Sequence, residues 1–271
     1  MGNLMKWRKF GQTRGMNMET VVLSFSGNAA VLELNRPDSL NAMNEQMLNE
    51  LLQALRQIEQ SDASIVLIRG KGRGFSAGGD IKTMLSVDDP EKFPEIMNNI
   101  QEVIMTLYSM PKIVVSVVHG PAAGLGLSFA LASDYVIATK EARLAMNFIG
   151  IGLIPDGGGH FLLAKRVGEV KAKHIIWEGK PMNADEAYEL GIVDFIVEDE
   201  QQIEQKIAEW QAKPLQAMIA TKKLYVNLTK DELLKVLQLE TEAQQKMRQT
   251  EDHREGVRAF LEKREPKFQG R

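Results

Sequence analysis

The sequence contains no cysteine and has only four histidines among its 271 residues. The absence of cysteine excludes disulfide bonds, thiol nucleophiles and cysteine-based metal sites. The four histidines are not spaced as metal ligands usually are, so we expect no metal site: His119, His160, His174 and His253. No apolar run reaches the roughly 18 residues that a membrane-spanning helix needs, and we expect no membrane association.

Charge of either sign is also not in large excess. The net charge is −3, with 44% hydrophobic and 25% charged residues, which is ordinary for a globular protein able to build a sizeable core. Without an overall positive field the chain is not expected to bind nucleic acid. We expect a cytoplasmic protein.

The first 17 residues differ from the rest of the chain. Lys6, Arg8 and Lys9 surround Trp7, and the segment lacks the apolar stretch of a secretory signal. A membrane-surface or targeting role is one interpretation. We favour a poorly ordered N-terminal extension over residues 1–17.

From Met18 onward, β-branched runs, glycine-rich loops and helical patterns alternate, which predicts an α/β fold with largely parallel strands. A hairpin is expected at 21–25 and 30–34, with further strands at 65–68, 113–118 and 135–138. Helices are expected between these strands, at 47–58, 96–107, 127–132 and 162–167. The glycine-rich loops are 70–79, 120–126 and 157–159.

The last part of the chain reads as purely helical, with helices expected at 215–226, 232–247 and 253–263. We place a boundary near Lys213, which divides a core of residues 18–213 from a helical region of residues 214–271. This region repeats apolar residues that one chain cannot easily bury, so we expect it to meet a partner: Leu215, Met218, Leu224, Leu233, Leu234, Leu237 and Leu239.

The first glycine loop matches the nucleophile-elbow pattern of α/β-hydrolases, with Ser76 as the nucleophile. The elbow needs its serine at a sharp turn directly after a strand, and residues 71–74 separate Ser76 from the expected strand. Asp156 and His160 would complete a triad in the right order, but they lie only four residues apart. The hydrolase is therefore a remote alternative.

The second glycine loop is similar to the nucleotide loop of short-chain dehydrogenases, which pair it with a later Tyr-x-x-x-Lys. The matching pair here, Tyr108 and Lys112, precedes the glycines, and Pro111 would break the helix between them. Tight turns that need glycine would explain all three loops without any ligand, because glycine tolerates positive φ and close backbone approach.

The sequence around the glycines resembles the enoyl-CoA hydratase/isomerase (crotonase) superfamily over residues 19–268. The resemblance is carried by five motifs in the expected order: Leu34-Asn-Arg-Pro with Asn41-Ala-Met, Phe75-Ser-Ala-Gly-Gly-Asp-Ile-Lys82, His119-Gly-Pro-Ala-Ala-Gly-Leu-Gly126, Gly152-Leu-Ile-Pro-Asp-Gly-Gly158, and Glu255-Gly with Ala259-Phe260. It implies a spiral of ββα units followed by C-terminal helices that mediate trimerisation. Family members are commonly homotrimers or dimers of trimers.

The resemblance also implies an acyl-CoA substrate, with coenzyme A as part of the substrate and no permanently bound cofactor. Two backbone N–H groups would stabilise a thioester enolate, and alignment assigns them to Ala77 and Leu125. A glycine-rich turn that opens a helix suits this chemistry, because its N–H groups are free and the helix dipole favours negative charge.

Residues that bind the CoA ester are assigned by the same resemblance: Asp38, Ser39, Leu40, Ala77, Gly78, Gly79, Asp80 and Leu125. Phe148 is expected to line the acyl pocket. Phe260 and Lys263 match residues that hold the nucleotide of a neighbouring subunit, although Lys263 could be a solvated helix charge and Phe260 could belong to the core.

The family's hydratases use two glutamates, and the matching positions hold Ser128 and Phe148, which cannot act as carboxylate bases. Asp156 is the carboxylate that remains in a motif position. Its Ile-Pro-Asp-Gly-Gly text resembles a branch of isomerases in which an acidic residue moves a proton. As an alternative, Asp156 could cap the following helix, and Ser128 could be a small packing residue.

We therefore expect an acyl-CoA isomerase that uses one acidic residue. An enoyl-CoA hydratase in which Asp156 alone activates water is the first alternative. A CoA-ester-binding subunit with little activity is the second.

Overall fold

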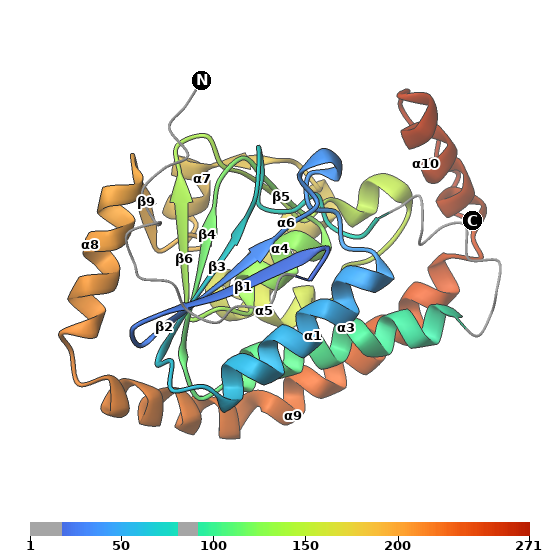
Figure 1. Ribbon diagram of the computed structural model, residues 1–271. Helices are drawn as coiled ribbons and strands as arrows, with labels where there is room; N and C mark the ends of the chain where they lie inside the picture. Colours follow the sequence, from blue (N-terminus) through green and yellow to red (C-terminus); the bar gives the residue numbers. More distant parts are fainter. Residues whose placement is uncertain (1–17, 81–91) are drawn as a thin grey trace.

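A six-stranded sheet forms the centre of the molecule (Figure 1). The computed structural model describes residues 18–80 and 92–271, so the extension at 1–17 and the motif residues Ile81 and Lys82 lie outside the described residues. The strands follow in spatial order β1 (Val21–Ser26), β2 (Ala29–Leu34), β3 (Ile65–Gly70), β4 (Ile113–Val118), β6 (Tyr135–Thr139) and β9 (Phe195–Val197). Among the described strands of this sheet only β1 and β2 pair antiparallel, which confirms the predicted largely parallel sheet.

A smaller three-stranded sheet lies beside the first, built from β5 (Pro121–Ala123), β7 (Arg143–Ala145) and β8 (Met182–Asn183). A parallel bridge between Ser76 and Ala122 connects the first glycine loop to this sheet. The loop that follows β3 and the loop that follows β4 are thereby held together.

Helices cover the sheets and follow the strands in the alternating order expected: α1 (Glu45–Gln60), α3 (Lys92–Ser109), α4 (Leu125–Leu131), α5 (Gly159–Val167), α6 (Glu169–Glu178), α7 (Ala184–Glu189) and α8 (Glu200–Gln211). Two 3₁₀ segments, η2 (Pro37–Ser39) and η3 (Asn147–Ile151), lie in connections. Asn44 caps α1 by accepting a hydrogen bond from the N–H of Met47, and α1 then buries its apolar stripe towards the sheet.

The C-terminal region differs from the prediction in one respect. Residues 215–247 form one helix, α9 (Leu215–Met247), instead of two, and α10 (Glu251–Glu262) follows. Residues 227–231 contain no glycine or proline. The hydroxyl of Thr229 donates a hydrogen bond to the Tyr225 carbonyl and also contacts the hydroxyl of Tyr108. The polar composition of this stretch therefore does not break the helix, and α9 runs the length of the molecule beside α3 (Figure 1).

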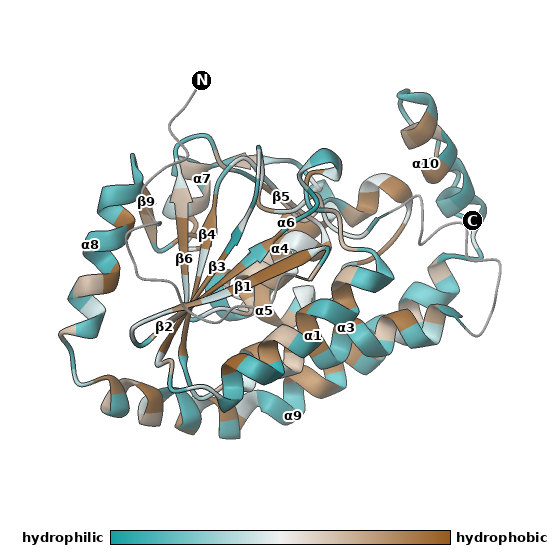
Figure 2. Cartoon of the chain, viewed as in Figure 1, coloured by the Kyte–Doolittle hydropathy of each residue, from teal (hydrophilic) through white to brown (hydrophobic). Residues whose placement is uncertain are grey.

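Apolar residues concentrate on the strands and on the inner faces of the helices (Figure 2). One cluster lies between the sheet and α1, α3, α4 and α5, and includes Leu233 and Leu237 of α9. A second lies on the other face, where Tyr135 stacks on Trp210 of α8 with ring centroids 4.5 Å apart. The site described below is built at the border of the first cluster.

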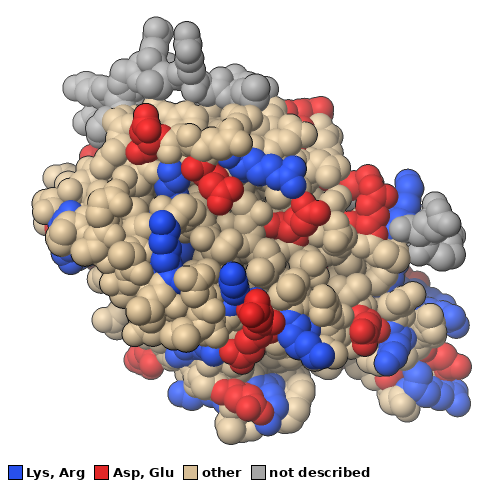
Figure 3. Space-filling model, turned by 90° about the horizontal axis from the view of Figure 1, so that it is seen from below, with Lys and Arg blue, Asp and Glu red and all other residues tan. Residues whose placement is uncertain are grey.

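The surface along which α9 runs carries scattered charges of both signs among larger uncharged areas (Figure 3). Leu224 and Leu239 are exposed on α9 as the partner hypothesis requires, and Tyr225 and Leu228 join them. Leu233 and Leu237 are buried in the chain's own core, so they do not belong to a contact face. Within the described ranges, no helix is long and apolar enough to cross a bilayer.

Candidate active site

The two glycine loops that follow β3 and β4 lie directly against each other. The N–H of Ser76 donates to the carbonyl oxygen of Pro121, and the N–H of Ala123 donates to that of Ser76, both at 3.0 Å. At Gly78, where φ is +98°, a Cβ atom would lie 2.6 Å from the Ala123 carbonyl oxygen and 3.4 Å from the Leu125 nitrogen. This close approach requires glycine, and it brings the backbone of Gly78 beside the first residue of α4.

The backbone N–H groups of Leu125 and Gly79, at this junction, donate no hydrogen bond within the described part of the chain. Leu125 is the first residue of α4, where an N–H has no acceptor in its own helix, and Gly124 before it provides no side-chain cap. Gly79 pairs with Met43 in a parallel bridge, in which the bonds are made by the Gly78 carbonyl and the Asp80 N–H. The N–H of Gly79 therefore points away from Met43.

The structure contradicts the assignment of the first donor to Ala77. The N–H of Ala77 donates to the carbonyl oxygen of Leu40 at 2.9 Å, so it is already used to hold the loop. Among the described residues, the N–H of this loop that finds no acceptor belongs to Gly79, two residues further on. For Leu125 the structure agrees with a free N–H at a helix N-terminus.

The first glycine loop is held in place by Asn41, a fully buried residue that the sequence analysis quoted only as part of a motif. Its amide nitrogen donates to the carbonyl oxygens of Lys71 and Gly74, each at 2.9 Å, and its amide oxygen accepts from the N–H of Arg36. The guanidinium of Arg36 donates in turn to the carboxylate of Asp80 at 2.9 Å. The motifs at 34–43 and 75–80 thus form one hydrogen-bonded unit.

Asp156 lies in the turn before α5 and is 6% exposed. Its Oδ1 atom is buried and has no hydrogen-bond partner among residues 18–80 and 92–271. Burial, followed by the negative charge of Glu240, raises the pKa of the Asp156 carboxyl to about 8. This carboxyl is therefore largely protonated at neutral pH, whereas an exposed aspartate would be ionised.

The capping alternative for Asp156 is wrong, because the residue at the N-cap of α5 is Gly158 and no side chain caps it. The backbone carbonyl of Asp156 instead accepts a hydrogen bond from the hydroxyl of Ser128 at 2.8 Å. Ser128 is fully buried on α4. It joins the Asp156 turn to α4, which makes it a structural residue and not only a small one.

The turn of Asp156 packs against the start of α4. A Cβ atom at Gly157 would lie 2.6 Å from Cδ1 of Leu125 and 3.2 Å from Cβ of Ser128. The ring of Phe148, on η3, lies against Gly124 and is 8% exposed. The structure thus gathers Gly79, Leu125, Phe148 and Asp156 around the N-terminus of α4.

The other residues assigned to CoA binding lie in two places. Asp38 and Ser39 form η2 and Leu40 ends it, and the Leu40 carbonyl connects this segment to Ala77. Phe260 lies on α10, which stands apart from the sheet (Figure 1), and Lys263 is the C-cap residue directly after this helix. Phe260 is 57% exposed, so it is not a core residue, and Lys263 is exposed as well.

Two alternative chemistries are excluded by contacts. The hydroxyl of Ser76 is fully buried and donates to the Asn41 carbonyl at 2.9 Å, so it is not presented as a hydrolase nucleophile. Tyr108 contacts Thr229 on α9, whereas the ammonium of Lys112 donates to the Ser61 carbonyl at the end of α1. These two side chains diverge and do not form a dehydrogenase pair.

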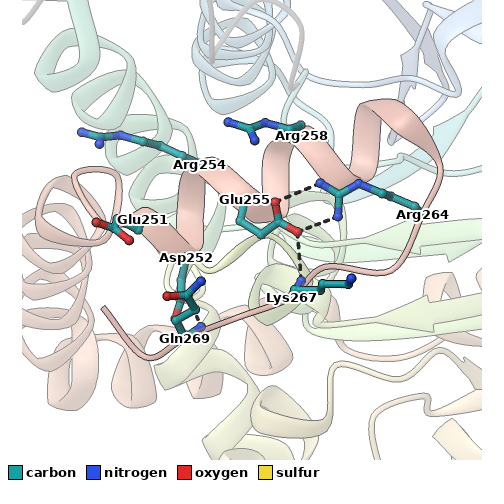
Figure 4. Close-up of a pocket in the computed structure, with 8 residues that line it drawn as sticks. All are labelled: Glu251, Asp252, Arg254, Glu255, Arg258, Arg264, Lys267 and Gln269. Carbon is teal, nitrogen blue, oxygen red and sulfur yellow. Dashed lines mark hydrogen bonds and ion pairs between the residues drawn. The ribbon is translucent and has the colours of Figure 1, made fainter.

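A cavity of about 550 Å³ with charged walls lies between α10 and the C-terminal tail, and neither Leu125 nor Asp156 lines it (Figure 4). Glu255 accepts hydrogen bonds from the guanidinium of Arg264 and the N–H of Lys267, and these contacts hold the pKa of its carboxyl down at about 2. Arg254 and Arg258 also line it. Among the described residues no group of three or more acidic or histidine side chains could hold a metal ion.

Comparison with known proteins agrees with this architecture. The model of the enoyl-CoA hydratase/isomerase family matches residues 24–271. The Bacillus subtilis (strain 168) protein YhaR, named as an enoyl-CoA hydratase/isomerase, is 54% identical over 93% of this chain and 100% of its own length. The 1,2-epoxyphenylacetyl-CoA isomerase of Escherichia coli (strain K12) is 34% identical over 94% and 100%.

A crystal structure of an enoyl-CoA hydratase from Mycobacterium avium subsp. paratuberculosis superimposes with a TM-score of 0.83 at 31% identity, covering 92% of this chain and 98% of that one. The α/β architecture with its C-terminal helices is therefore the crotonase fold. The chain belongs to the enoyl-CoA hydratase/isomerase family and is an enzyme of that family.

Proposed function

We propose that this enzyme isomerises the double bond of an enoyl-CoA thioester and uses Asp156 as its single proton carrier. One observation carries the proposal. The carboxyl of Asp156 is buried with its Oδ1 unpartnered, in a turn packed against Leu125, whose backbone N–H is free. Ser128 and Phe148 occupy the two positions at which hydratases of the family have glutamates. The motifs therefore supply no second carboxylate that would support the addition of water.

The reaction would proceed through a dienolate. The Asp156 carboxylate removes a proton from C2 of a 3-enoyl thioester, and the electron pair of that C–H bond moves towards the thioester oxygen. The N–H groups of Gly79 and Leu125 stabilise the negative charge on this oxygen. The protonated carboxyl then returns its proton to C4, and the double bond moves from C3–C4 to C2–C3.

The electrostatics of Asp156 suit both halves of this cycle. A carboxyl with a pKa of about 8 is a stronger base, once ionised, than an ordinary aspartate, and it holds a proton well enough to return it. General acid–base catalysis is most effective when the pKa of the group lies near the working pH. Burial also keeps bulk water away from the dienolate.

The remaining assignments from the family resemblance fit around this centre. Asp38, Ser39, Leu40 and the loop 77–80 would bind the CoA portion, and Phe148 would contact the acyl chain. We further propose a cytoplasmic homotrimer or dimer of trimers, in which Phe260 of α10 and Lys263 at the end of this helix reach the nucleotide of a neighbouring copy. The exposed position of α10 supports this arrangement.

A substrate panel tests the proposed function. The enzyme is incubated separately with 3-enoyl-CoA, 2-enoyl-CoA and an epoxyacyl-CoA, and the products are identified by mass spectrometry and NMR. Conversion between the 3-enoyl and 2-enoyl esters without a gain of 18 mass units supports the isomerase; the epoxide is included because the E. coli relative is named for such a substrate. A 3-hydroxyacyl-CoA product formed faster than any isomer would refute it.

A further inference from the structure

The long helix α9 carries a carboxylate and an amide on a face that is otherwise apolar. Leu233, Leu237, Glu240 and Gln244 recur at intervals of four, three and four residues and are all buried, with Glu240 and Gln244 each 2% exposed. The spacing places the four side chains on one stripe of the helix. Leu233 and Leu237 of this stripe pack in the core, whereas Glu240 and Gln244 contact the segment that contains Asp156.

Glu240 holds the backbone on the C-terminal side of Asp156. One carboxylate oxygen accepts from the N–H of Gly158 at 2.7 Å, and the other accepts from the N–H of His160 at 3.1 Å and contacts its Nδ1 atom at 2.7 Å. These donors belong to the first turn of α5, where a negative charge is favoured. Three contacts compensate for taking the carboxylate out of water.

Gln244 holds the backbone on the N-terminal side. Its amide nitrogen donates to the carbonyl oxygen of Ile154 at 2.6 Å. The two side chains of α9 therefore bracket residues 154–158, and the hydroxyl of Ser128 holds the carbonyl of Asp156 from α4. The backbone of this turn is fixed from two helices, although Oδ1 of the Asp156 carboxyl is unpartnered.

We propose that Glu240 and Gln244 are positioning residues, which aim the unpartnered carboxyl of Asp156 by holding the backbone on both sides of it. The inference rests on the proposed function, in which Asp156 carries the proton. A hydrogen bond to the carboxyl itself would also orient it, but would change its affinity for the proton. Fixing the flanking backbone orients the group and leaves both oxygens available.

Glu240 has a second effect that Gln244 lacks, because its charge acts on Asp156. Glu240 is the charged group that raises the pKa of Asp156 beyond the effect of burial. The other elements packed here present two titratable side chains among the described residues. His160 of α5 contacts Glu240, and His253 of α10 contacts the Ile151 carbonyl. The residues that α4 presents to this turn, Leu125 and Ser128, carry no charge. Removal of the Glu240 charge should therefore lower the pKa of Asp156.

The test compares Glu240→Gln with Gln244→Leu in the full-length enzyme on 3-enoyl-CoA. Misplacement of a catalytic group by about 1 Å can cost up to about 100-fold in rate, so we expect kcat to fall at least 10-fold in both variants while KM changes little. In the profile of kcat/KM against pH, the acidic limb should move about one pH unit lower in Glu240→Gln. It should stay in place in Gln244→Leu.

The outcomes distinguish a positioning role from a purely structural one. A purely structural role would lower the melting temperature of both variants and leave kcat and the acidic limb unchanged, which overturns the inference. If Glu240→Gln does not fold, Gln244→Leu alone decides through its kcat. If Asp156→Asn retains full activity, the proposed function itself fails, whereas an inactive Asp156→Asn together with normal positioning variants overturns only this inference.

Discussion

Replacing Asp156 with asparagine removes a carboxyl that titrates very differently in the folded and unfolded chain. In the folded chain its pKa is raised from 3.8 to about 8, first by burial and then by the charge of Glu240. The unfolded carboxyl loses its proton near its ordinary value, so between about pH 4 and pH 8 the folded state holds a proton that the unfolded state has released. By linkage, this group makes the free energy of unfolding fall as pH rises through that window.

The size of the effect follows from the two pKa values. From the ordinary value of 3.8 to neutral pH is about three pH units, and each is worth about 1.4 kcal/mol. Asp156 should therefore cost about 4 kcal/mol of stability at pH 7 and close to nothing below pH 4. Asparagine takes up no proton in either state, so relative to wild type the variant should gain about 4 kcal/mol between pH 4 and pH 7.

Urea unfolding followed by circular dichroism at pH 4, 5.5 and 7 measures this gain. Any constant cost of burying the amide cancels, because the prediction concerns the change with pH. Asp231→Asn, at an exposed position of α9, is the matched control and should follow the wild type. In the same preparation the isomerase rate of Asp156→Asn should fall 10²–10⁴-fold, as is typical for loss of a general base. A variant that loses stability relative to wild type as pH rises would refute the reasoning, since that sign belongs to a carboxylate stabilised by the fold.

Three further predictions follow from the backbone contacts and the surface of α9. Leu125→Pro removes the free N–H and should cost roughly 2.7–4 kcal/mol of transition-state stabilisation. Leu125→Ala keeps the N–H and should retain most of kcat. Similar rates in the two folded variants would contradict the role of this amide. Asn41→Leu leaves the carbonyls of Lys71 and Gly74 without their donor and should lower the free energy of unfolding, measured in urea, by about 2–4 kcal/mol. A loss below about 0.5 kcal/mol would show that these hydrogen bonds are dispensable. Light scattering should find a trimer or hexamer at micromolar concentration that Leu228→Glu weakens, because Leu228 is 72% exposed on α9; a wild-type monomer would contradict the assembly.

Much of the fold could be predicted because its signals are local. The β-branched runs predicted the strands of the parallel sheet, and the helix expected at 47–58 lies within α1. The break expected within residues 227–231 was wrong. Polar composition resembled a loop, but only glycine or proline would have forced one against the packing of α9 on α3.

The site was less predictable because it depends on pairing between distant segments. Which N–H of the loop 77–79 is free is decided by the contacts of Leu40 and Met43, more than thirty residues away. A lone glutamate such as Glu240 is typical of a solvated helix face, and its partners lie about eighty residues earlier. The buried stripe that it shares with Leu233 and Leu237 was the available signal.

If Asp156 carries the proton as proposed, its fixed position also determines the stereochemistry of the reaction. Asp156 is held in one turn between α4 and α9, so in the proposed reaction the same carboxyl would meet C2 and C4 from the same face of the planar dienolate. The proton should therefore leave and arrive suprafacially. Because the carboxyl is shielded from water, part of a deuterium label placed at C2 should reappear at C4 in ordinary water, on the face from which it was taken.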